Sequence, residues 1–234
     1  MNLLRDILNF CFPRKCPVCG GRLYGDEVIC ISCLSAMPYT YYHRIPDNRL
    51  VQRLSFNIPV NRASGCFFYV AESPYHQILH QLKYRGRAWL GVGMGQLMAT
   101  HICADDASFF EGVDALIPVP LHQKREGQRG YNQSALLAKG ISEVVGIPVV
   151  NDAIYRVVDN PTQTHLTDTE RWENVQGIFQ TAFDIAVRLQ GRHLMLVDDV
   201  TTTGATLASC AEVLYKAVPQ CQVSVIVLGV ADLG

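Results

Sequence analysis

Two adjacent carboxylates and a run of threonines stand together near the C-terminus, in the string Asp198-Asp199-Val200-Thr201-Thr202-Thr203-Gly204-Ala205-Thr206. Backbone N–H groups at a helix N-terminus and threonine hydroxyls donate hydrogen bonds to a phosphate monoester, and Gly204 permits a tight turn. Two acids directly before such a loop suit the vicinal diol of a phosphorylated ribose, because carboxylates accept hydrogen bonds from hydroxyls. The string therefore predicts a site for a sugar 5-phosphate. In the alternative, the acids only cap the helix and the threonines form an ordinary turn.

Four of the nine cysteines form two C-x-x-C pairs near the N-terminus: Cys16 and Cys19, then Cys30 and Cys33. This spacing is close to that of a zinc ribbon, in which four thiolates complete a tetrahedral Zn²⁺ shell. A closed shell leaves no open position for water, so the predicted zinc is structural. Chance pairs or disulfides are the alternative. The remaining cysteines are scattered, as is typical of buried thiols: Cys11, Cys66, Cys103, Cys210 and Cys221.

Three further stretches carry cations or polar residues that suit a pyrophosphate with Mg²⁺, or equally a nucleic-acid backbone. Their candidate residues are Lys83, Tyr84, His122, Arg125, Arg129, Arg156, Gln163 and Arg171. The stretch from Arg156 to Gly177 is polar and long for a connector, as expected of a mobile cover over an active site. The alternatives are solvated surface charge for the cations and a disordered insertion for the long stretch.

The composition fits a globular protein, with 234 residues of which 49% are hydrophobic. A net charge of -1 gives no global attraction to nucleic acid or anionic membrane, so such affinity requires local basic clusters. No apolar stretch approaches the roughly 20 residues that span a bilayer, and the N-terminus lacks a signal-peptide core. We therefore expect a cytoplasmic protein without membrane insertion.

Apolar runs alternate with helical patterns through most of the chain, which predicts a parallel, doubly wound α/β sheet flanked by helices. The expected strands are Cys66–Val70, Asp114–Pro120, His193–Asp198 and Val223–Gly229. The expected helices are Pro74–Leu82, Trp89–His101, Gln133–Val145 and Ala205–Ala217. Such sheets bind ligands at the carboxyl ends of their strands, so the loops after Pro120 and Val197 should meet at one site. The expected division is a zinc-ribbon module with an N-terminal helix (1–40), a linker with short extended pieces (41–64), and the α/β domain (65–234).

The string from Asp198 to Thr206 resembles the motif with which type I phosphoribosyltransferases bind phosphoribosyl pyrophosphate (PRPP). The resemblance implies that Asp198 and Asp199 contact the ribose hydroxyls and that Thr201 through Thr206 hold the 5-phosphate. There are two departures. Thr201 stands where many members have an apolar residue. Thr202 stands where purine-salvage members place an aspartate that helps to deprotonate the base, which disfavours oxopurine transfer.

Together with that string, several other stretches resemble the ComF family. They are the paired cysteines, Leu82-Lys83 with Gly86, Pro118-Val119-Pro120-Leu121 with Arg129-Gly130-Tyr131-Asn132-Gln133, Arg156 with Thr162-Gln163, and Asn174. Amidophosphoribosyltransferases share a looser version of this order. The resemblance implies a type I phosphoribosyltransferase fold, a cytoplasmic bacterial setting, and a link to competence, in which single-stranded DNA is taken up for transformation.

Three functions are left open by these patterns and resemblances. In the first, Mg²⁺ and the basic loops bind the pyrophosphate of PRPP while the ribose passes to an unknown acceptor, mostly by positioning and charge stabilisation. No catalytic residue is identified for it. In the second, the phosphate site binds PRPP, ribose 5-phosphate, a nucleotide or single-stranded DNA without transfer. In the third, the zinc ribbon docks a helicase of the DNA-uptake machinery.

Overall fold

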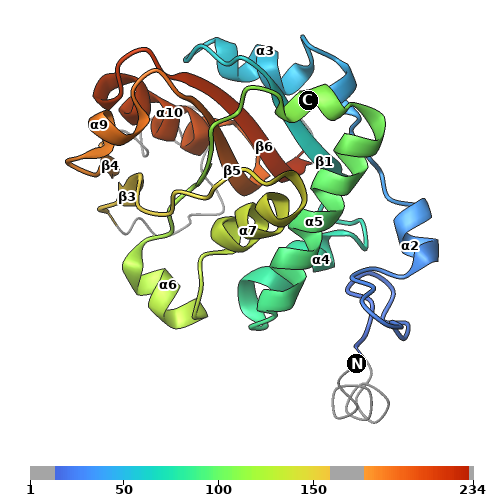
Figure 1. Ribbon diagram of the computed structural model, residues 1–234. Helices are drawn as coiled ribbons and strands as arrows, with labels where there is room; N and C mark the ends of the chain where they lie inside the picture. Colours follow the sequence, from blue (N-terminus) through green and yellow to red (C-terminus); the bar gives the residue numbers. More distant parts are fainter. Residues whose placement is uncertain (1–13, 159–176, 232–234) are drawn as a thin grey trace.

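A parallel four-stranded sheet forms the centre of the computed structural model, which describes residues 14–158 and 177–231 (Figure 1). The strand order is β1 (Ala63–Tyr69), β6 (Gln222–Ala231), β5 (His193–Thr201) and β2 (Ala115–Pro118). All three strand pairings are parallel. β5 and β6 are buried along nearly their whole length, as expected of apolar strands covered on both faces. The predicted α/β class with a parallel sheet flanked by helices is confirmed.

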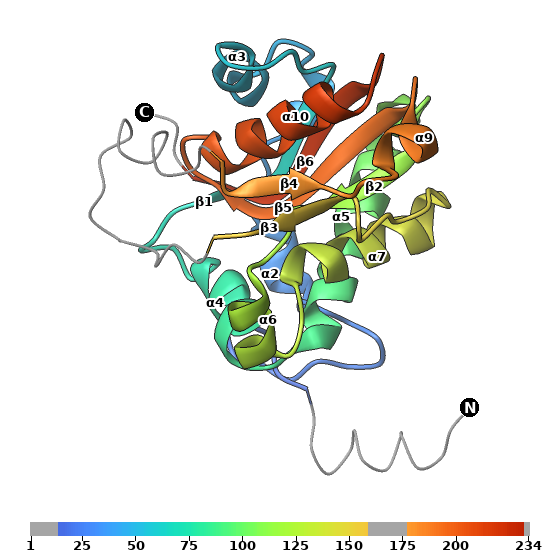
Figure 2. The ribbon, with the colours of Figure 1, turned by 90° about the vertical axis from the view of Figure 1, so that its left-hand side faces the viewer.

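Helices cover both faces of this sheet (Figure 2). One face packs against α4 (His76–Tyr84), α5 (Ala88–Asp105) and α7 (Gln133–Val145), and the other against α3 (Arg49–Ser55) and α10 (Ala205–Ala217). α5 and α7 approach closely because Gly95 and Gly140 lie at their contact, where an added Cβ would collide with the facing backbone. α7 and α10 have the bounds predicted from the sequence.

The smaller elements surround this core. They are α2 (Ile31–Ser35), η1 (Tyr42–Arg44), η2 (Ala107–Phe110), α6 (Gln123–Arg129), α9 (Ile185–Leu189), and the strands β3 (Ile154–Arg156) and β4 (Phe179–Thr181). β3 and β4 form a separate antiparallel pair. None of the described helices is long and apolar enough to cross a bilayer.

Residues 41–64, expected to be a linker with short extended pieces, instead contain η1 and α3. Asn48 caps α3 by accepting from the backbone N–H groups of Leu50 and Val51, and its amide donates to the carbonyl of Ala63 at the start of β1. Leu50 and Leu54 lie on one face of α3 and are fully buried in the core. The expectation of extended structure was wrong because a helix of under two turns shows no sustained period, although its cap and its leucine pair specify it.

The cysteine-containing segment packs against α4 and α5. The side chain of Val28 fills the space beside Gly93 of α5. Gln81 of α4 donates from Nε2 to the carbonyl of Pro17 at 3.0 Å, and the hydroxyl of Tyr75 donates to the carbonyl of Cys33 at 2.6 Å. The boundaries 1–40, 41–64 and 65–234 stay a prediction, and the N-terminal helix expected in the first of them lies outside the described residues.

Candidate functional site

The predicted sugar-phosphate loop lies at the carboxyl end of β5, near the middle of the sheet. Asp198 and Asp199 belong to the last part of β5, and α10 begins at Ala205 directly after the loop. Gly204 has φ 83°, a left-handed conformation that glycine adopts without strain. The hydroxyl of Thr203 accepts from the N–H of Ala205 at 3.3 Å. A strand, this loop and a helix therefore follow one another in the order that the sequence predicts.

Asp198 is buried and held by two hydrogen bonds. Its Oδ1 accepts from the hydroxyl of Ser134 at 2.9 Å and from the backbone N–H of Asp199 at 2.8 Å. Burial, together with the neighbouring charge of Asp199, raises the pKa of Asp198 to about 7, against the opposing effect of these hydrogen bonds. The Asp198 side chain is therefore fixed by a contact from α7 and by the backbone of its own strand.

Asp199 is paired with Lys83 from the end of α4. Its Oδ2 lies 3.0 Å from Lys83 Nζ, and its side chain is only 5% exposed. Burial opposes the charge of Lys83, but the attraction of Asp199 outweighs it and raises the pKa of Lys83 above its usual value. Lys83 is therefore the counter-ion of Asp199.

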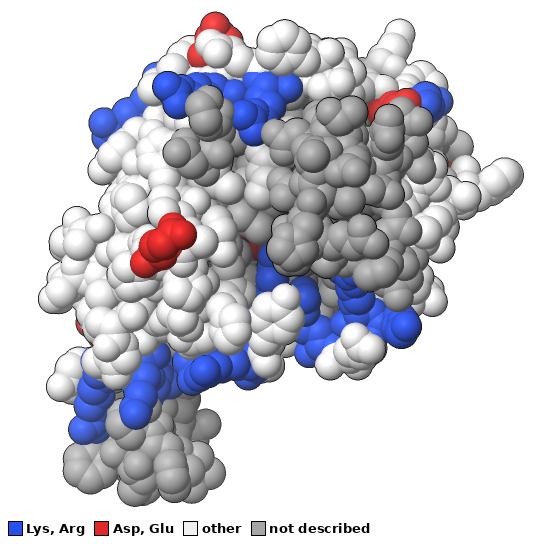
Figure 3. Space-filling model, turned by 180° about the vertical axis from the view of Figure 1, so that it is seen from behind, with Lys and Arg blue, Asp and Glu red and all other residues white. Residues whose placement is uncertain are grey.

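Lys83 also lines an open basic cavity of about 450 Å³ beside the acids. The lining residues are Lys83, Tyr84, Gly86, Arg125, Gln128 and Arg129. The Arg129 guanidinium lies 5.9 Å from the centre of the Tyr84 ring and donates to the side-chain oxygen of Gln133. Figure 3 shows Lys and Arg side chains gathered along the lower part of the face opposite to Figure 1. Four predicted residues, Lys83, Tyr84, Arg125 and Arg129, therefore meet at one cavity.

His122 and Arg156 do not line that cavity. His122 precedes α6 and accepts at Nδ1 from the N–H of Lys124 at 3.3 Å, which makes it the cap of that helix. Arg156 lies on β3, with its guanidinium 5.8 Å from the centre of the Phe179 ring, and lines a second cavity of about 500 Å³. Gln163 and Arg171 lie outside the described residues. Their assignment to pyrophosphate and flexible loops stays a prediction.

Two contacts of α3 with the phosphate loop were missed by sequence reasoning. Arg53 donates from Nη1 to the carbonyl of Thr202 at 2.8 Å. Leu54 packs under Gly204, where an added Cβ would come within 2.9 Å of Leu54 Cδ2. The cap at Asn48 was the sequence signal that could have identified this helix. α3 thus supports the loop from the side opposite to Lys83's helix.

Gly204→Ala is expected to lower the free energy of unfolding by more than Gly146→Ala. Both glycines have positive φ, a conformation that costs a non-glycine residue about 1–2 kcal/mol. A Cβ at Gly146 meets open space, whereas one at Gly204 presses on Leu54, which adds about 1 kcal/mol of overpacking. Urea unfolding of the two variants measures the difference. Equal losses would show that the loop does not depend on its packing against α3.

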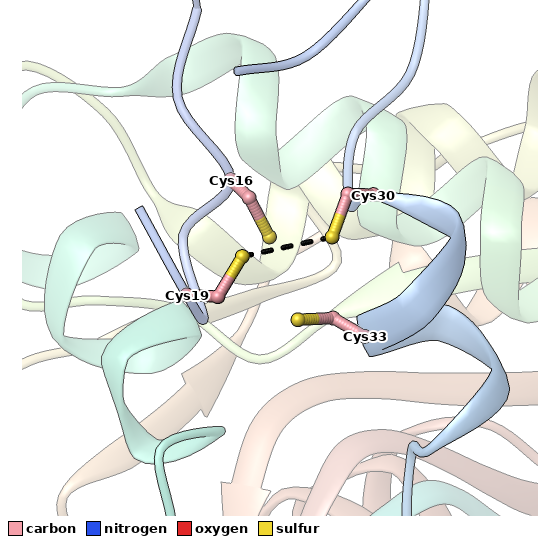
Figure 4. Close-up of side chains that lie close together, drawn as sticks. All are labelled: Cys16, Cys19, Cys30 and Cys33. Atoms are coloured by element: carbon pink, nitrogen blue, oxygen red, sulfur yellow. Dashed lines mark hydrogen bonds between the residues drawn. The ribbon is translucent and has the colours of Figure 1, made fainter. Parts of the chain in front are cut away.

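The four paired cysteines converge on one point (Figure 4). Their sulfurs all lie within 4.8 Å of one another, and Cys19 and Cys30 approach to 3.6 Å. All four are free thiols, so the disulfide alternative is not supported. Burial, followed by the neighbouring thiols, raises the pKa of Cys33, so this thiol becomes a thiolate more readily when a cation lies between the four sulfurs. The cluster fits a zinc ion, which would stabilise the surrounding loop.

Known proteins resemble this chain over most of its length. DNA utilization protein YhgH of Shigella flexneri is 31% identical over 202 residues, which cover 86% of this chain and 84% of that protein. Competence protein F of Haemophilus influenzae (strain ATCC 51907 / DSM 11121 / KW20 / Rd) is 30% identical over 228 residues, covering 90% and 94%. Competence protein ComFC of Bacillus subtilis (strain 168) is 28% identical over 206 residues, covering 86% and 71%.

No family model matches the chain. A solved structure described as the allosteric regulatory enzyme of purine biosynthesis aligns with a TM-score of 0.38 and 17% identity, over 58% of this chain and 26% of that one.

Proposed function

The chain belongs to the ComF family, and from this premise we propose that it binds PRPP or a related ribose 5-phosphate, with Mg²⁺, in a role in DNA uptake and natural transformation. The choice of ligand rests on one observation. The buried acids Asp198 and Asp199 stand directly before the Thr-Gly loop, and Lys83, which pairs with Asp199, also lines the basic cavity. Groups for a diol, a monoester and a pyrophosphate are thus adjacent. The competence role is supported by the relatives named for competence and DNA utilization.

Each part of PRPP has a complementary group in this arrangement. The 5-phosphate would accept from the N–H groups and hydroxyls of Thr201 to Thr206, where the N-terminus of α10 favours an anion. The ribose diol would donate to Asp198 and Asp199. The pyrophosphate would lie beside Lys83, Arg125 and Arg129, with Mg²⁺ supplying further charge neutralisation. Lys83 would link the last two sites, because it faces both Asp199 and the cavity.

Transfer of the ribose is proposed without a named catalytic residue. In such a step the bond from ribose C1 to pyrophosphate breaks and a bond to the acceptor forms, with pyrophosphate carrying the electron pair away. Thr202 offers no carboxylate to take a proton from an acceptor, and its carbonyl is bound to Arg53. The residues therefore support PRPP binding more strongly than a particular reaction.

Calorimetry with PRPP and Mg²⁺ tests the proposal. The unaltered protein is expected to bind, and Asp199→Asn to bind at least about tenfold more weakly, because a hydrogen bond to a charged group contributes about 1.5–3 kcal/mol. Asp152→Asn is the matched control, since Asp152 is a surface acid paired with Arg188. Normal binding by Asp199→Asn would contradict the diol assignment. No heat with either PRPP or ribose 5-phosphate would rule out the ligand.

Single-stranded DNA is the second candidate ligand, favoured by one feature of the cavity. Tyr84 is 71% exposed beside Arg125 and Arg129, and an exposed aromatic among cations offers a base-stacking surface. The same titration with a single-stranded oligonucleotide separates the candidates. Binding that weakens steeply with salt and in Tyr84→Ala, without change in Asp199→Asn, supports the DNA-binding module. Docking of a competence helicase on the cysteine-containing segment is proposed only from the family's role.

A further inference from the structure

A second cluster of metal-ligating side chains lies apart from the paired cysteines. His43 belongs to η1, and His101 and Asp105 stand four residues apart on α5, so that both face the same side of that helix. One ligand atom from each of the three residues lies within 4.8 Å of the other two. Two imidazoles and a carboxylate therefore converge on one place.

Packing fixes the two imidazoles against each other. The ring of Tyr39 stacks on His101 with centroids 4.0 Å apart, and the ring of His43 meets His101 edge-on at 5.7 Å. The His43 side chain is 2% exposed, and its Nε2 lies 2.9 Å from Asp105 Oδ2. The three ligands therefore need little ordering before they bind an ion, which lowers the entropic cost of binding.

His101 Nε2 is the unexplained atom of this cluster. Within the described structure it is buried and has no hydrogen-bond partner, although the neighbouring His43 and Asp105 are already bonded to each other. Buried polar atoms are nearly always satisfied in native proteins, so an orphan nitrogen on a residue of this cluster points to a missing ligand. A hydrogen-bonded network alone leaves this nitrogen unsatisfied.

We propose that His43, His101 and Asp105 bind a divalent transition-metal ion such as Zn²⁺. Two imidazoles and one carboxylate form a donor set that suits such ions. Ligands at about 2 Å from a shared ion lie at most about 4 Å apart, so the atoms must draw together by up to about 1 Å on binding. The ion would tie η1, and with it the segment leading to α3, to the long helix α5.

Arg44 is the charged group that most directly opposes a cation at this place. Its Nε donates to Asp105 Oδ2 at 2.5 Å, and its Nη2 donates to Asp105 Oδ1. A carboxylate has about four lone-pair positions on its two oxygens, so Asp105 can hold Arg44 and an ion together. Outer hydrogen bonds of this kind orient ligating carboxylates in metal sites. Arg44 therefore positions Asp105 while reducing the net attraction for the ion.

Cobalt titration of the full-length protein, with its cysteine cluster already filled by zinc, tests the proposal. We expect one further equivalent of Co²⁺ to bind and to give visible d–d bands. Thiolate charge-transfer absorption should be absent, because its appearance would show that Co²⁺ had replaced zinc at the cysteines. His101→Ala and Asp105→Asn should each lose this equivalent. His80→Ala, which removes an exposed histidine outside the cluster, should retain it.

Thermal unfolding provides the second measurement. Zn²⁺ should raise the Tm of the unaltered protein and of His80→Ala, because a ligand that binds only the folded state stabilises it, and should not raise that of His101→Ala or Asp105→Asn. Asp105→Asn is included because asparagine has nearly the size of aspartate, so a loss of the zinc effect in both variants cannot be explained by a folding defect of His101→Ala. No further equivalent in the unaltered protein, or an equivalent that persists in both cluster variants, would overturn the proposal.

Discussion

Replacing Lys83 with methionine is expected to lower the free energy of unfolding by about 2–3 kcal/mol, because it leaves the buried carboxylate of Asp199 without its partner. The loss should fall below the 3–5 kcal/mol of fully buried pairs, since the Lys83 side chain is 24% exposed. Urea unfolding of the variant and of the unaltered protein measures this loss.

The double variant Lys83→Met/Asp199→Asn is expected to recover most of that loss, because it removes both charges together. Lys216→Met is the matched control. Lys216 pairs with Glu212 on the exposed surface of α10, where an ion pair contributes about 0–1 kcal/mol. If Lys83→Met cost no more than Lys216→Met, Lys83 would not be the counter-ion of the acid pair. The buried charge of the proposed PRPP site would then need another explanation.

The central elements could be predicted from the sequence because their signals are local. The apolar face with Leu137 and Ile141 predicts α7 with its full bounds. The structure adds a cap at each end, because Asn132 accepts from the N–H of Ser134 and Gly146 takes the left-handed conformation. β5 and β6 read as apolar runs because both of their faces are buried. Where periodicity, cap and burial agree, the pattern specifies the element.

Such local patterns do not predict contacts between segments that are distant in the sequence. Arg53 and Thr202 are 149 residues apart in the sequence, and nothing near either residue indicates the other. Lys83 was predicted to serve a pyrophosphate, whereas its nearest charged partner in the structure is Asp199. The sequence predicts a role for the acids Asp198 and Asp199 and for Lys83 separately. The ion pair between Lys83 and Asp199 depends on how α4 packs beside β5.

Cys19→Ser is expected to weaken zinc binding by at least about 100-fold, since loss of even an outer partner of a ligand costs about 10–100-fold. Cys19 is the exposed member of the cluster, so serine removes a thiolate with little change in packing elsewhere. Structural zinc supplies folding free energy of about 10–16 kcal/mol in small zinc modules, and the buried Leu23, Ile29 and Met37 are few apolar side chains for a segment of this length. Residues 14–40 should therefore become sensitive to proteases, which zinc analysis and limited proteolysis would measure.

The effect of Cys19→Ser should extend beyond the cysteines to the ligand cavity. Gln81 donates to the carbonyl of Pro17 and accepts from Arg87, and it stands two residues before Lys83 on α4. Loosening the zinc loop removes one of the contacts that hold this end of α4, so PRPP binding should weaken by a few-fold, less than in Asp199→Asn. Cys103→Ser, at a cysteine outside the cluster, should change neither zinc content nor binding. Full zinc occupancy in Cys19→Ser would refute the four-thiolate site, and unchanged PRPP affinity in a zinc-depleted chain would show that the two sites are independent.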